Sequence, residues 1–103
     1  MKGIYVALIE VEPLPGCTLC AADVEGGFAR CYVPATSAAS AEKAARAKLA
    51  KEHLHVVAVE WCVSFADAEW ENPDSEEAKK CAREARKTRE LVLGRLDVWG
   101  RDA

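Results

Sequence analysis

The alternation of apolar and polar positions divides the chain into short runs that predict strands. Ile4 to Val11 is an apolar run that includes β-branched and aromatic residues, and Phe28 to Val33 is a second run that ends at a proline. Leu54 to Phe65 is the longest run and is dense in valine and aromatic residues. We expect three strands here, the first two paired antiparallel as a hairpin with a long loop.

Two segments between and after these runs have the composition of helices. Thr36 to His53 is rich in alanine, and three residues near its start are suitable N-caps: Thr36, Ser37 and Ser40. A second helix is expected from Pro73 to Leu93, because Asp74 and Glu77 can form a capping-box-like pair at its start. Gly94 would end that helix, and Arg95 to Trp99 can add a short edge strand.

The resulting order is β-β-α-β-α, with a possible final β, in a single domain of residues 1–103. Residues 13–27 form a cysteine-containing loop in this interpretation, and residues 66–73 form an acidic connection. We expect an α+β fold built as a small two-layer sandwich, ferredoxin-like in general form. Both helices would cover one face of a mixed sheet, in which a right-handed crossover makes the second and third strands parallel.

The first and third strand runs are apolar on both of their faces. In the third run one side is expected to meet the helices and consists of Val57, Val59, Trp61, Val63 and Phe65. The opposite side is also largely apolar, although a sheet face open to water normally alternates with polar residues. Because two helices can cover only one face, we expect a second subunit, a partner protein or a long loop to cover the other, most simply a second copy in a homodimer.

Charge and composition narrow the classes of partner and location. The chain carries 14 basic and 17 acidic residues, a net charge of −3, so nucleic acid is not an expected partner. No apolar run is long enough to cross a bilayer, and the N-terminus does not resemble a signal peptide. The five cysteines are an odd number, which favours reduced thiols and a cytoplasmic location.

Cys17 and Cys20 form a CxxC pair, the one motif here with a known chemical use. Two thiolates at this spacing can chelate zinc, with Cys31 as a third ligand. The fourth ligand would be His53, His55 or Cys62. No second pair of ligands at close spacing follows, so we expect no cofactor and keep zinc as the alternative.

Three charged residues are candidates for binding because of where the pattern places them: Arg30, Glu60 and Arg89. Arg89 falls on the apolar stripe of the predicted second helix, and a buried arginine commonly meets a carboxylate or a phosphate. Arg30 shares a strand face with aromatic residues and can pair with Glu10 or Glu60 across strands.

No catalytic residue is assigned, because the sequence lacks the common phosphate-binding, hydrolase and metalloprotease motifs. We therefore expect a non-catalytic binding or interaction module that uses an apolar sheet face, of the kind found among small bacterial and phage proteins. Two alternatives remain open. One is a zinc-binding protein that uses Cys17 and Cys20, and the other is a small enzyme with a pocket near Arg89 or Arg30.

Overall fold

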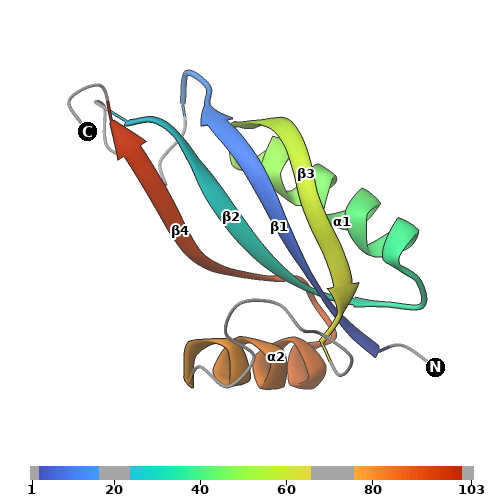
Figure 1. The fold of residues 1–103 in the computed structure, drawn as a ribbon. Helices are drawn as coiled ribbons and strands as arrows, with labels where there is room; N and C mark the ends of the chain where they lie inside the picture. The colour runs from blue at the N-terminus through green and yellow to red at the C-terminus, as the bar shows by residue number, and fades with distance from the viewer. Residues whose placement is uncertain (1–2, 17–23, 66–75, 101–103) are drawn as a thin grey trace.

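The computed structural model describes residues 3–16, 24–65 and 76–100 of the 103-residue chain (Figure 1). Within these residues, four strands form one antiparallel sheet in the order β3-β1-β2-β4, accompanied by two helices. The α+β class expected from the sequence is therefore confirmed. The elements are β1 (Gly3–Pro13), β2 (Val24–Ala35), α1 (Ala38–Lys51), β3 (Leu54–Ser64), α2 (Glu76–Thr88) and β4 (Val92–Gly100).

The hairpin of β1 and β2 is confirmed, and it is longer than the sequence pattern indicated. The two strands pair from Gly3 opposite Ala35 to Val11 opposite Gly27, so the last part of the expected loop 13–27 belongs to β2. β3 pairs with the other side of β1. Hence β2 and β3 run in the same direction but are separated by β1, and every neighbouring pair in the sheet is antiparallel rather than mixed.

The two helices pack on opposite faces of the sheet. Successive residues of a strand point to opposite faces, and the two core clusters divide β1 in this way. The α1 side contains Ala7, Ile9 and Val11 of β1, packed with Ala41, Ala45 and Leu49 of the helix. The α2 side contains Ile4 and Val6 together with Tyr32 of β2, packed with Ala78, Cys81, Ala82 and Ala85.

The expected placement of both helices on one face is therefore wrong, and the two-layer sandwich and the ferredoxin-like form are not confirmed. Figure 1 shows α1 running alongside β3, whereas α2 lies crosswise to the strands at the end of the sheet where β1 begins. The apolar face that we expected a partner to cover is thus partly covered by the chain's own second helix. Val6, on that face, has no exposed surface at all. The physical reason is that an apolar helix stripe can be buried on either face, and α2 buries its stripe where the first helix is absent.

Two irregularities in β3 change which of its residues share a face. Its pairing with β1 shifts between Leu8 and Ile9 and again between Glu10 and Val11, which leaves Glu60 and Val57 as extra residues. Val59 consequently packs on the α1 side, whereas Trp61 and Val63 pack on the α2 side. The expected common face of Val57, Val59 and Trp61 is wrong, because strict alternation fails at each bulge.

The ends of the helices depend on local backbone chemistry. Ser37 caps α1, since its side-chain oxygen accepts a hydrogen bond from the backbone N–H of Ser40 at 3.2 Å. α2 ends at Thr88, earlier than expected, because Arg89 adopts the left-handed conformation with φ of 60°. Gly94 is therefore not a helix stop but lies within β4.

Gly94 is required where β4 approaches Tyr32. A Cβ atom at position 94 would lie 2.7 Å from the Cε1 atom of Tyr32 and 3.2 Å from the backbone oxygen of Arg30. No other residue type fits without displacing the buried tyrosine ring. Neither helix in the described parts of the chain is long and apolar enough to cross a membrane.

Candidate functional site

Arg30 lies on β2 and forms an ion pair that the sequence pattern did not predict. Its Nη1 atom donates to Oδ2 of Asp97 on β4 at 2.7 Å, and both side chains are partly buried. The partners expected from the sequence were Glu10 and Glu60. Asp97 was missed because the expected final strand was short, so its register against β2 was unknown.

Arg30, Glu60 and Arg89 are not gathered into one site. Glu60 is an exposed bulge residue on β3, which lies two strands from β2, a separation of about 10 Å. Arg89 is exposed just after the end of α2, so the expectation that it lies on the apolar stripe of a longer helix is wrong. The reason is the left-handed turn at Arg89, which ends the helix before that residue could face the core.

The candidate zinc ligands divide into two groups. Cys17 and Cys20 lie outside the described residues. Cys31 is fully buried beneath α1, and burial raises the pKa of its thiol to about 12. A zinc ligand must be a thiolate, so this environment opposes the role expected of Cys31. Among the described residues, no group of three histidine, cysteine or acidic side chains could hold a metal ion.

His53 contacts the described beginning of the cysteine loop, at Leu14 and Gly16. It adopts the left-handed conformation, with φ of 59°, and its carbonyl oxygen accepts the backbone N–H of Leu14 at 2.8 Å. Its ring lies against Gly16, where a Cβ atom would be 3.7 Å from Cγ of the imidazole. The turn after α1 is therefore attached to the segment that directly precedes Cys17 in the sequence.

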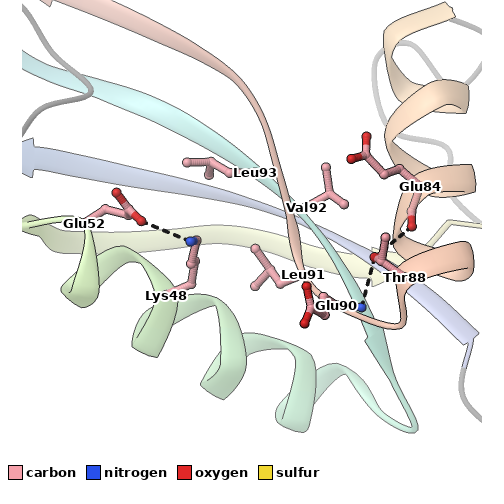
Figure 2. A pocket seen from close by; sticks show the side chains of 8 residues that line it. All are labelled: Lys48, Glu52, Glu84, Thr88, Glu90, Leu91, Val92 and Leu93. Carbon is pink, nitrogen blue, oxygen red and sulfur yellow. Dashed lines mark hydrogen bonds and ion pairs between the residues drawn. The ribbon is translucent and has the colours of Figure 1, made fainter.

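A hollow of about 430 Å³ lies at the start of β4, between the C-terminal ends of both helices (Figure 2). Leu91 and Leu93 lie on the side of α1, and Val92 lies on the side of α2. Its polar lining residues are Lys48, Glu52, Glu84, Thr88 and Glu90.

The polar groups of this hollow are largely engaged with one another. Lys48 Nζ donates to Oε1 of Glu52 at 3.0 Å. The Thr88 hydroxyl donates to the backbone oxygen of Glu84 at 2.9 Å and accepts the backbone N–H of Glu90 at 3.3 Å. These contacts stabilise helix ends and a turn, and they do not form a nucleophile–base arrangement.

An apolar surface continues from the hollow along β4, and we call it the β4 strip. α1 approaches β1, β2 and β3, but among the described residues it makes no close backbone approach to β4. The side chains of β4 on this face are therefore only partly covered, and Val98 is 47% exposed. The strip consists of Leu91, Leu93, Leu96 and Val98.

The sequence-based interpretation missed the β4 strip because it assigned the first two of these leucines to a helix. The alternation of Leu96, Asp97 and Val98 was the available signal, since it is the period of a half-buried strand. No protein-family model, no curated protein and no solved structure matches this chain.

Proposed function

We propose that this protein is a non-catalytic interaction module that binds a protein partner through the β4 strip. The observation that carries this proposal is the combination of half-buried leucines with the exposed Val98 on an edge strand. Apolar side chains beside an unpaired strand edge favour protein association, because both the side chains and the backbone groups gain partners there.

The alternative of a small enzyme receives less support from the same region. The hollow next to Arg89 is open, and its lysine and threonine side chains are held by neighbouring groups of the helices. Arg30 is held by Asp97. Catalysis usually requires convergent polar groups directed at a substrate, whereas these groups are directed at each other.

Site-specific photo-crosslinking tests the proposal directly. A benzophenone amino acid at Val98 should give a discrete crosslinked product in the native host, because a partner would cover this side chain. Val57 is the matched control, since it is 43% exposed on the opposite edge strand. Absence of any discrete product at position 98, or equal products at both positions, would count against the β4 strip as a binding surface.

A zinc-binding protein is the second candidate, and the position of His53 favours it. The imidazole lies against Gly16, one residue before Cys17, so His53 is a more suitable third ligand than the buried Cys31.

Native mass spectrometry of metal-free protein titrated with zinc tests whether the chain binds zinc through His53. One zinc per chain, lost in His53→Asn and Cys17→Ser but kept in His55→Asn, would support a site at the loop. Asparagine tolerates the left-handed backbone at position 53. Failure to bind zinc, or equal binding in all variants, would contradict it.

A further inference from the structure

Helix α2 has a basic surface on the side that faces away from the sheet. Its buried stripe, which includes Ala82 and Ala85, packs against the strands. Figure 1 shows the helix crosswise to the strands at one end of the sheet, so its outer side is at the margin of the molecule. Five exposed basic residues occupy that outer side, and we call them the α2 basic face: Lys79, Lys80, Arg83, Arg86 and Lys87.

The helical repeat arranges the α2 basic face symmetrically about Arg83. At about 100° per residue, Lys79 and Arg86 lie about 40–60° to one side of Arg83. Lys80 and Lys87 lie at similar angles on the other side, and the buried stripe is on the opposite side of the helix. The face therefore consists of two rows of cations with one arginine between them, and it extends for about 12 Å along the helix axis.

The stability of α2 itself does not explain this arrangement. The helix dipole favours cations in the last turn, where Arg86 and Lys87 lie, whereas Lys79 and Lys80 directly follow the first turn. On α1, by contrast, two cations each pair with a carboxylate four residues away. None of the described residues forms an ion pair with a cation of the α2 basic face. These charges are therefore available to an external polyanion.

The net charge of −3 does not describe this surface, because the acidic residues of α2 lie at its borders. Glu76 and Glu77 are in the first turn, before the basic residues begin, and Glu84 lines the hollow next to Val92. From residue 79 to residue 87 the chain carries five basic residues and one acidic residue. Nucleic acid, which the charge of the whole chain argued against, is compatible with this local charge.

The geometry of the α2 basic face favours the major groove of B-form DNA over other polyanions. An anionic membrane takes up the apolar face of a helix, and in α2 that face is buried on the sheet. The major groove is about 12 Å wide, admits one α-helix and has a phosphate backbone on each side. Two rows of long cationic side chains, about 100° apart on a helix about 10–12 Å across, can reach both backbones.

We infer that α2 binds B-form DNA by lying in the major groove, with one row of the α2 basic face against each phosphate backbone. Arg83 is then directed at the groove floor, where an arginine can donate to guanine. The phosphate contacts supply most of the affinity and are independent of base sequence. This surface is separate from the β4 strip, which lies on the α1 side of the sheet, so the inference does not rest on the proposed function.

Fluorescence anisotropy with a labelled 24-base-pair DNA duplex tests the inference. The logarithm of the binding constant should fall with the logarithm of the NaCl concentration with a slope of about −3.6 to −4.5, which corresponds to four or five neutralised phosphates. The double variant Lys80→Gln with Lys87→Gln removes one row. Its slope should be less negative by about 1.8, and it should bind at least about tenfold more weakly at 0.1 M NaCl.

The matched control is the double variant Lys43→Gln with Lys51→Gln. It removes two exposed lysines from α1 and has the same net charge as the α2 variant, so its slope should equal that of the parent protein. Circular dichroism checks that each variant is folded. Should the first α2 variant not fold, Lys79→Gln with Arg86→Gln removes the other row and should give the same change in slope.

Four results would overturn the inference. They are no binding to the duplex at 50 mM NaCl, an equal loss of binding in the α1 control, binding to poly-L-glutamate as tight as to DNA, and binding to anionic vesicles alone. Duplex RNA of the same sequence should bind more weakly, because its major groove is too narrow for a helix, and equal affinity would contradict the placement in the groove. Val98→Asp, which alters the β4 strip, should leave DNA binding unchanged, so the two surfaces are tested independently.

Discussion

Arg30 and Asp97, which are 67 residues apart in the sequence, form an ion pair of 2.7 Å that joins β2 to the edge strand β4. The two residues do not pair in direct register. Phe28 is opposite Asp97, and the pairing shifts between Ala29 and Cys31, so Arg30 lies at a bulge where β4 has one extra residue. The arginine thereby reaches along the sheet to the carboxylate and helps to fix the position of the last strand.

Removing this carboxylate should weaken the attachment of β4. We expect Asp97→Asn to lower the free energy of unfolding by about 1 kcal/mol, because the pair is partly buried and charge-assisted. Glu42→Gln is the control, since it breaks the more exposed Glu42–Arg46 pair on α1 and should cost only about 0.3–0.5 kcal/mol. Urea unfolding of dilute protein measures both. Equal losses in the free energy of unfolding for the two variants would show that the Arg30–Asp97 pair stabilises the protein no more than an exposed ion pair does.

Gly94 should tolerate no side chain. We expect Gly94→Ala to destabilise the protein by about 1–3 kcal/mol, because the added methyl group would overlap the ring of Tyr32. Gly3→Ala is the matched control, since no atom lies within 4 Å of the position where its Cβ would be placed. Thermal unfolding of both variants tests this. A stable Gly94→Ala protein would mean that β4 does not approach Tyr32 as closely as described.

The position of α2 over one face of the sheet can be tested with a buried charge. Val6→Asp should cost about 3–5 kcal/mol and leave little folded protein, because the carboxylate would be buried under α2 without a partner. Val98→Asp is the control, because that side chain is 47% exposed and the monomer should fold normally. Circular dichroism distinguishes the two results. A well-folded Val6→Asp protein would contradict the placement of α2.

The buried thiol of Cys31 should make stability depend on alkaline pH. Burial raises the pKa of Cys31 from 9.0 to about 12, so the unfolded chain releases this proton first. The stabilisation is complete below pH 9 and is lost as the pH rises from 9 to 12, by at most about 1.4 kcal/mol per pH unit for one thiol. Cys31→Ala should flatten this decline.

Denaturant unfolding of the parent and the Cys31→Ala variant between pH 8 and pH 11 measures the difference. Tyr32→Phe offers a parallel comparison, because burial also raises the pKa of the Tyr32 hydroxyl to about 12. Identical pH profiles for the parent and Cys31→Ala would indicate that the thiol ionises as easily in the folded protein as in the unfolded chain.

The sequence by itself determined most of the local structure. The hairpin of β1 and β2, the alanine-rich helix capped by Ser37 and the long valine-rich strand β3 all lie where the pattern placed them. These features depend on residues that are close in the sequence: turn residues, a capping hydroxyl and the spacing of apolar side chains. The burial of Ala41, Ala45 and Leu49 on one stripe was predictable for the same reason.

Only the tertiary structure decided which face α2 covers, where β3 bulges, and that Asp97 is the partner of Arg30. An alanine stripe can pack against either apolar face of a sheet. The choice depends on where the chain leaves β3, next to the beginning of β1, where the Phe65 N–H donates to Ile4 O at 2.8 Å. Register shifts and the end of α2 at Arg89 likewise depend on contacts between distant segments, and a local pattern carries no information about those contacts.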